Sequence, residues 1–103
     1  MLTNEFMTEL SRSIFDLLDK VIVIFDDKRE EPVEIDRALS AMEPGKVKVL
    51  AYLEDNMAGN IEQLKVMMKN GKVGMVKNYQ LRKTKAHGTV VAFMLRIYEE
   101  EVV

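Results

Sequence analysis

The chain has 103 residues, enough for one domain with a single hydrophobic core and too few for a second. Apolar residues make up 48% and charged residues 31%, the profile of a soluble globular domain rather than a disordered chain. Cysteine is absent, which excludes disulfides, thiolate metal sites and cysteine nucleophiles. The chain also has only two glutamines, and a low content of cysteine and glutamine is typical of thermophile proteins.

Nothing in the sequence indicates export or membrane insertion. The first residues lack the basic start and the apolar run of a signal peptide. The longest apolar runs, 21–25 and 90–95, fall far short of the ~20 residues that a membrane-spanning helix needs. We therefore expect a cytoplasmic protein with no membrane partner.

Charge is divided unevenly along the chain. Residues 1–56 contain seven Lys or Arg and thirteen Asp or Glu, whereas residues 57–96 contain eight Lys or Arg and a single acid, Glu62. Three glutamates follow at 99–101. The formal net charge of −2 therefore conceals a basic block. Such a block suggests either an anionic partner or a self-complementary surface.

The first predicted element is a helix over residues 4–20. Its apolar residues recur at spacings of three and four, which places them on one face: Phe6, Leu10, Ile14, Leu17 and Leu18. Residues 21–25 are all apolar and mostly β-branched. This run predicts a strand that is buried on both faces.

A second helix is predicted after the charged loop 26–31. It begins at Pro32, because proline is favoured in the first turn of a helix, and it ends at Pro44-Gly45. Its apolar residues recur at helical spacing: Ile35, Ala38, Leu39 and Met42. Residues 46–49 alternate between lysine and valine, and residues 50–53 are all apolar. This pattern predicts a second strand over residues 46–53.

A third helix is predicted between Asn56 and the Asn70-Gly71 stop, with Asp55 or Asn56 as its N-cap. Its expected buried stripe is Met57, Ile61, Leu64 and Met68. Val66 and Met67 lie off this stripe. There they would expose a second apolar strip, suited to a subunit contact.

Two strands are predicted to end the chain. In 72–85 alternate residues share one face: Val73, Met75, Tyr79 and Leu81. Segment 89–98 is strongly apolar and is predicted as a strand, although part of it would tolerate a helix. Residues 86–88 form the expected turn, so the two strands are expected to form a hairpin.

The predicted fold class is therefore α+β. Residues 1–103 are expected to form a single α+β domain with the order α-β-α-β-α-β-β. Strands separated by helices favour right-handed parallel crossovers, whereas the final hairpin is antiparallel. A mixed four-stranded sheet with helices packed on it and a C-terminal β-hairpin is the simplest architecture.

The basic block is the first candidate site. A basic two-stranded ribbon can lie in a groove of duplex nucleic acid, where its cations release counterions from phosphate. The candidate nucleic-acid-binding residues are Lys65, Lys69, Lys72, Lys77, Arg82, Lys83 and Lys85. A solvated basic face is the simpler interpretation, and a pI near 5.4 argues against a general nucleic-acid coat.

Carboxylates at the ends of two predicted strands form the second candidate site. Asp26 and Asp27 follow the first strand, and Glu54 and Asp55 follow the second. If these strands are parallel neighbours, all four side chains lie at one sheet edge, where they could hold Mg²⁺ for phosphoryl transfer or nuclease chemistry. Helix capping and solubility explain the same residues more simply.

The sequence supports no catalytic residue. His87 is the only histidine and lies in a predicted turn, where polar residues are common. The three serines lie in predicted helices without the sequence of a nucleophile elbow. We expect no cofactor.

The interpretation favoured by the sequence is a small non-enzymatic binding protein that forms a homodimer. The acidic half of one copy would face the basic block of another, burying apolar edges between them. Nucleic-acid binding and Mg²⁺-dependent catalysis remain as alternatives.

Overall fold

The structure is a computed structural model that describes residues 1–37, 40–54, 56–85 and 88–98. Of these residues, 58% lie in strands and 15% in a helix. The elements in chain order are α1 (Asn4–Leu17), β1 (Leu18–Phe25), β2 (Glu30–Glu34), β3 (Ala41–Glu43), β4 (Lys46–Leu53), β5 (Gly59–Met68), β6 (Val73–Lys83) and β7 (Thr89–Arg96). The described protein is therefore mostly β, and the predicted α+β class with three helices is wrong.

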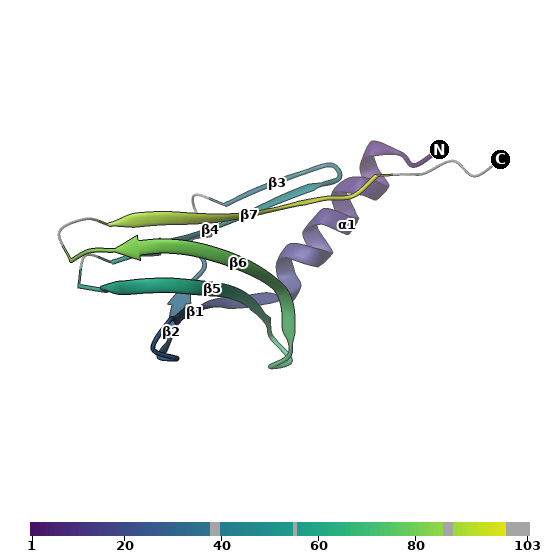
Figure 1. The fold of residues 1–103 in the computed structure, drawn as a ribbon. Coiled ribbons are helices and arrows are strands. Elements are labelled where there is room, and N and C mark those ends of the chain that lie inside the picture. Colours follow the sequence, from purple (N-terminus) through teal and green to yellow (C-terminus); the bar gives the residue numbers. More distant parts are fainter. Residues whose placement is uncertain (38–39, 55, 86–87, 99–103) are drawn as a thin grey trace.

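The strands form two antiparallel sheets. One has four strands in the order β2-β1-β5-β6, and the other has three in the order β3-β4-β7. Figure 1 shows the three-stranded sheet lying over the four-stranded one, with α1 leading from the end of the four-stranded sheet to the β3–β4 end of the other. The predicted mixed sheet with parallel crossovers is wrong, because each described strand pair is antiparallel.

The core lies between the two sheets. The four-stranded sheet contributes Val21, Val23, Phe25, Ile61, Leu64 and Val66. The three-stranded sheet contributes Val47, Val49, Ala51, Leu53, Val91 and Phe93. An isolated bridge between Ile35 and Ala51 joins the sheets on one side. On the other side the edge strands β6 and β7 are not paired with each other.

Helix α1 begins where the sequence predicts, and it passes directly into β1. Thr3 caps its N-terminus, because the Thr3 Oγ1 accepts a hydrogen bond from the Phe6 N–H at 3.1 Å. The helix ends at Leu17 rather than residue 20, without a glycine. The Arg37 guanidinium donates to the carbonyls of Phe15 and Leu18, and the Lys69 N–H donates to that of Leu17. These bonds satisfy carbonyls that a helix end leaves open.

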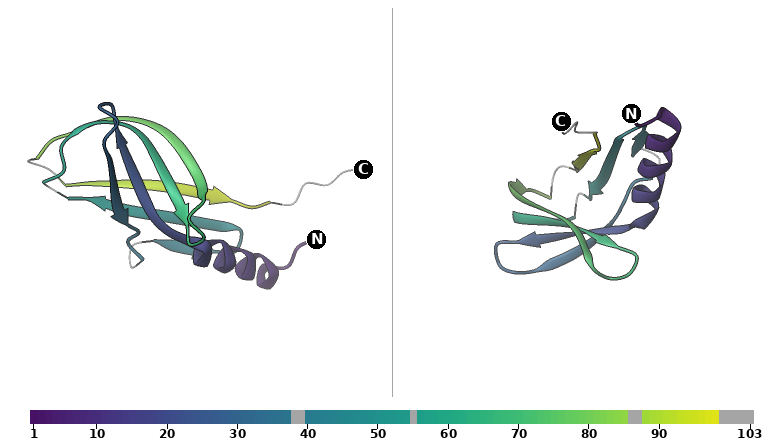
Figure 2. Two further views of the ribbon diagram at one scale, coloured as in Figure 1. Left: turned by 90° about the horizontal axis from the view of Figure 1, so that it is seen from below. Right: turned by 90° about the vertical axis from the view of Figure 1, so that its right-hand side faces the viewer.

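A buried polar contact holds the middle of α1 against the hairpin formed by β3 and β4. Ser11 is fully buried, and its Oγ accepts a hydrogen bond from the Gly45 N–H at 3.1 Å. Gly45 lies in the turn between β3 and β4 with φ +74°. Figure 2 shows the helix beside this hairpin, clear of the four-stranded sheet.

The predicted second helix is wrong, because the described part of that segment is extended. Pro32 lies in β2, an edge strand, where a missing N–H need not break a ladder of hydrogen bonds. Val33 packs against the core and Ile35 is buried, so the apolar spacing is two rather than 3.6 residues. Ala38 and Leu39, two residues of the predicted stripe, lie outside the described residues.

The predicted third helix is also wrong, and a β-bulge explains the error. The segment forms β5, whose pairing with β1 shifts between Ile24 and Phe25. Glu62 is the extra residue, so Ile61 and Leu64 both face the core three residues apart. This spacing imitates helical periodicity. Val66, expected to be exposed, is fully buried, while Met67 faces the outer side. Asp55, an expected N-cap, lies outside the described residues.

The predicted terminal hairpin is wrong, although both of its strands are confirmed. β6 pairs with β5 and β7 pairs with β4, so the two strands belong to different sheets. Five residues, 84–88, join them, whereas the tightest hairpins have two-residue loops that hold the strands in register. The expected turn residues Ala86 and His87 lie outside the described residues.

The other strand predictions are confirmed. β4 has the predicted bounds, and the predicted strand 21–25 lies within β1. Burial of β1 on both faces is wrong, because Ile22 and Ile24 are partly exposed on its outer face. In the described ranges, no helix has both the length and the apolar character needed to cross a membrane.

Candidate interaction surface

The candidate nucleic-acid-binding residues are divided between the two ends of β6. Lys69 and Lys72 are exposed at the turn that precedes β6, whereas Arg82 and Lys85 are exposed at or beyond its other end. An eleven-residue strand is about 35 Å long. The predicted helix that would have carried Lys65 and Lys69 on its exposed side, with Lys72 just after its stop, does not form.

Three further lysines of the basic block lie in different surroundings. Lys65 lies on the outer face of the four-stranded sheet. Lys77 reaches across to the other sheet, where its Nζ lies 5.9 Å from the centre of the Phe93 ring. Lys83 is only 3% exposed, and its Nζ donates to the Thr84 carbonyl at 2.7 Å. The block is therefore not gathered on a single exposed face.

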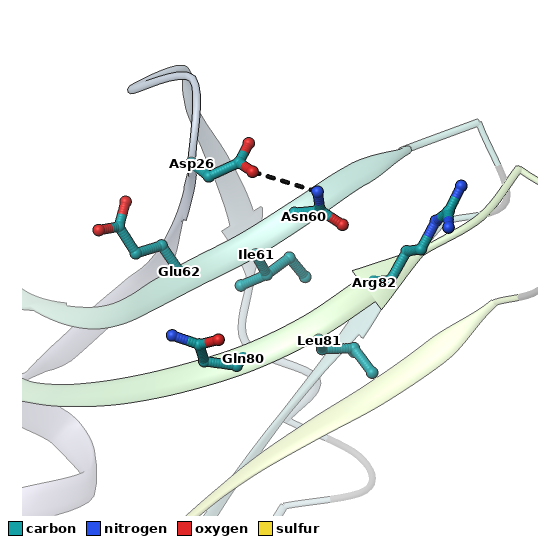
Figure 3. A pocket seen from close by; sticks show the side chains of 7 residues that line it. All are labelled: Asp26, Asn60, Ile61, Glu62, Gln80, Leu81 and Arg82. Atoms are coloured by element: carbon teal, nitrogen blue, oxygen red, sulfur yellow. Dashed lines mark hydrogen bonds between the residues drawn. The ribbon is translucent and has the colours of Figure 1, made fainter.

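A polar hollow of about 410 Å³ lies on the outer side of β5 and β6 (Figure 3). Its lining is Asp26, Asn60, Ile61, Glu62, Gln80, Leu81 and Arg82. The Asp26 carboxylate accepts a hydrogen bond from the Asn60 amide at 3.1 Å, and Glu62 forms an ion pair with Lys28 at 3.2 Å. Both signs of charge are present, so the hollow does not favour a polyanion.

Two of the candidate metal ligands, Asp26 and Asp27, accept local hydrogen bonds. Asp27 accepts a hydrogen bond from the Arg29 N–H at 3.0 Å, in the turn between β1 and β2. Glu54 is exposed beyond β4, and Asp55 lies outside the described residues. Across the part of the chain that is described, no three Asp, Glu or His side chains are grouped so that they could hold a metal ion. The parallel strands that would have brought these carboxylates together are absent there.

The free edge of β7 stands out among the described surfaces. Residues 89–95 contain no charge and no proline, in a chain where 31% of residues are charged. β7 pairs with β4 over eight residues without a register shift, and in the described chain no strand covers its other edge. Natural edge strands usually carry lysines, prolines or bulges that prevent pairing with another chain. β7 lacks these protections between residues 89 and 95.

The backbone groups that face this edge can be identified. The Ile97 N–H donates to the Gly45 carbonyl at 2.7 Å, so odd-numbered residues of β7 direct their backbone toward β4. Even-numbered residues therefore direct theirs to the free edge, because the two alternate along an antiparallel strand. The Lys77 Nζ lies 3.4 Å from the Ala92 carbonyl oxygen, in agreement with this direction. Val90, Ala92 and Met94 thus present their N–H and carbonyl groups outward.

The side chains of the same residues form an exposed apolar face. Val90 is 50% exposed and Met94 is 47% exposed, and Ala92 between them is also exposed. Tyr52 lies opposite Val90 on β4 and is 46% exposed. We call the backbone edge of residues 89–95 with these side chains the β7 edge.

The uncharged run 89–95 is a signal for the β7 edge in the sequence, although on its own it predicted only an apolar strand. Comparisons with protein-family models, curated proteins and solved structures found no match to the chain.

Proposed function

We propose that this protein is a non-enzymatic binding protein that forms a homodimer by pairing the β7 edges of two copies. The observation that supports the proposal is an edge strand with seven uncharged residues, outward backbone groups and exposed apolar side chains. A second copy offers the same strand, so a two-fold axis can pair them antiparallel. Adding a strand to an open edge is a recurrent mode of recognition.

The uncharged run is centred on Ala92, which sets the register of the proposed pair. Ala92 lies opposite Ala92 of the second copy, and Val90 lies opposite Met94. Residues 90, 92 and 94 of each copy then form about six backbone hydrogen bonds across the interface. The two exposed apolar faces join into one. The hydrogen bond from the Lys77 Nζ to the Ala92 carbonyl is exposed and long. We therefore expect the stronger backbone hydrogen bonds of the dimer to replace it.

This pairing depends on backbone hydrogen bonds and apolar contacts rather than on ion pairs. We therefore expect the wild-type protein to be a dimer at micromolar concentration, in low salt and in moderate salt alike. Light scattering measures this directly. A monomer at micromolar concentration in low salt would contradict the proposal.

Ala92→Lys tests the location of the interface. A lysine at the centre of the pair places two like charges face to face, so we expect the variant to be a monomer. Ala41→Lys is the matched control. Ala41 is an exposed alanine on the same sheet, but it lies on β3, at the opposite edge. This control should remain a dimer.

Thermal unfolding followed by circular dichroism shows whether the two lysine variants keep the wild-type fold. Both substitutions are at exposed positions, where changes in the free energy of unfolding are usually within about 0.5 kcal/mol. If Ala92→Lys is folded and remains a dimer, the β7 edge is not the interface.

A further inference from the structure

A lysine of the four-stranded sheet reaches the centre of the β7 edge. Lys77 lies on β6 directly opposite Leu64 of β5, and directly paired residues of antiparallel strands share one face of their sheet. Leu64 is fully buried in the core, so Lys77 also lies on the inner face, but it is exposed. Its side chain therefore crosses the open side of the sandwich, from β6 toward β7.

Three contacts hold the Lys77 amine at this place. Its Nζ lies 3.4 Å from the Ala92 carbonyl oxygen, 5.3 Å from the centre of the Tyr79 ring and 5.9 Å from the centre of the Phe93 ring. A cation within about 6 Å of an aromatic ring is attracted to the face of that ring. Within the described residues, no carboxylate forms an ion pair with Lys77. A positive charge without a paired carboxylate therefore lies beside the uncharged β7 edge.

Ala92 is the residue at which the two β7 edges of the proposed dimer meet. In that register the Ala92 carbonyl accepts a hydrogen bond from the Ala92 N–H of the second copy. The Lys77 amine already donates to the same carbonyl, so the incoming strand must displace it. Because both copies of Ala92 lie at the two-fold axis, pairing also brings the two Lys77 amines toward each other. Like charges that approach one another oppose association.

We propose that Lys77 regulates the homodimer by competing with the second copy for the Ala92 carbonyl. This inference rests on the proposed pairing of the β7 edges, and it adds that the charge of one amine sets the strength of the dimer. Inward-pointing charged side chains at open sheet edges are a recurrent protection against pairing with other chains. Acetylation removes the charge of a lysine, so acetylation of the Lys77 Nζ should strengthen the dimer.

Lys77→Met and Lys77→Gln test this role, because both remove the charge at an exposed position. Losing one exposed hydrogen bond of this kind changes an equilibrium roughly threefold, and two are lost when a dimer forms. We therefore expect the dimer Kd of both variants to lie roughly tenfold below that of the wild type. Lys77→Arg keeps the charge and should have the Kd of the wild type. Analytical ultracentrifugation of a dilution series gives each Kd.

Two controls separate this role from a general effect of charge or of added apolar surface. Lys72→Met removes an exposed lysine from the turn before β6 and should leave the Kd unchanged. Lys77→Met combined with Ala92→Lys should be a monomer, because the stronger dimer still uses the β7 edge. Circular dichroism shows whether each variant keeps the wild-type fold.

The salt dependence of the Kd gives a second measure of the same charge. Salt screens the repulsion between the two Lys77 amines, so added salt should lower the Kd of the wild type more than that of Lys77→Met. If the wild type is a dimer and both neutral variants have an equal or higher Kd, the role of Lys77 is wrong and the homodimer proposal stands. Monomers throughout the dilution series, the wild type included, would contradict the homodimer and this inference with it.

Discussion

Phe25→Ala is expected to lower the free energy of unfolding by about 3–5 kcal/mol, the usual cost of removing a fully buried aromatic ring. Phe25 is 0% exposed and ends β1, where it packs between the two sheets. The Arg29 guanidinium lies 4.1 Å from the centre of its ring. A domain of this size has about 5–15 kcal/mol of stability, so the variant should be close to unfolding.

Phe6→Ala is the matched control, since Phe6 is 50% exposed on α1. Its removal costs little because the ring already contacts water. Urea unfolding of both variants, followed by circular dichroism, gives the two free energies. Equal losses for Phe25 and Phe6 would contradict the placement of the core between the two sheets.

Gly45→Ala is expected to lower the free energy of unfolding by about 2–5 kcal/mol. Gly45 has φ +74°, where a side chain costs about 1–2 kcal/mol. An added Cβ would also lie 2.6 Å from the Met7 Cε and 2.8 Å from the Ile97 carbonyl oxygen. The methionine can move aside, but the carbonyl belongs to backbone that pairs with Gly45 itself. Overpacking of this kind costs about 1–3 kcal/mol.

Gly71→Ala separates the two causes. Gly71 has φ +85°, but nothing lies within 4 Å of its added Cβ. The free energy of unfolding of Gly71→Ala should therefore fall by only about 1–2 kcal/mol, the cost of a side chain in this backbone conformation. Urea unfolding measures the difference between the variants. If Gly71→Ala costs as much as Gly45→Ala, the close packing of α1 and residue 97 around the β3–β4 turn is wrong.

Local patterns in the sequence predicted the elements whose spacing is regular. The stripe of α1, the apolar run of β1 and the alternation in β4 and β6 each correspond to an observed element. The errors occurred where regular spacing was broken. The bulge at Glu62 placed Ile61 and Leu64 three residues apart, and Pro32 occupied a sheet edge rather than a helix start. Neither feature can be recognised without the partner strand.

The candidate sites depended on these elements, so they changed with them. In the predicted arrangement Lys65 and Lys69 share the exposed face of a helix because their spacing is four, and Lys72 follows directly after the helix stop. On β5 and the turn that follows it, Lys65 lies on the sheet and the other two lie beyond its end. The carboxylate site likewise required parallel strands. The observed strand pairing thus separates the candidate lysines, and it removes the parallel neighbours on which the grouping of the carboxylates was argued.

The β7 edge could be predicted only in part. The sequence shows that residues 89–95 are uncharged, and it predicts a strand there. Which edge remains open depends on the pairing of β7 with β4 rather than with β6, a contact between residues 36 to 50 positions apart. Local periodicity holds no information on that choice.

The most direct test of the central claim is disulfide formation by Ala92→Cys. In the proposed register the two copies of residue 92 form a hydrogen-bonded pair with their Cα atoms about 5.5 Å apart, within the range that a disulfide spans. No other cysteine is present. Mild oxidation at micromolar concentration should convert Ala92→Cys into a covalent dimer faster than Ala41→Cys, which lies on the opposite edge. Equal rates for the two variants would contradict pairing of the β7 edges.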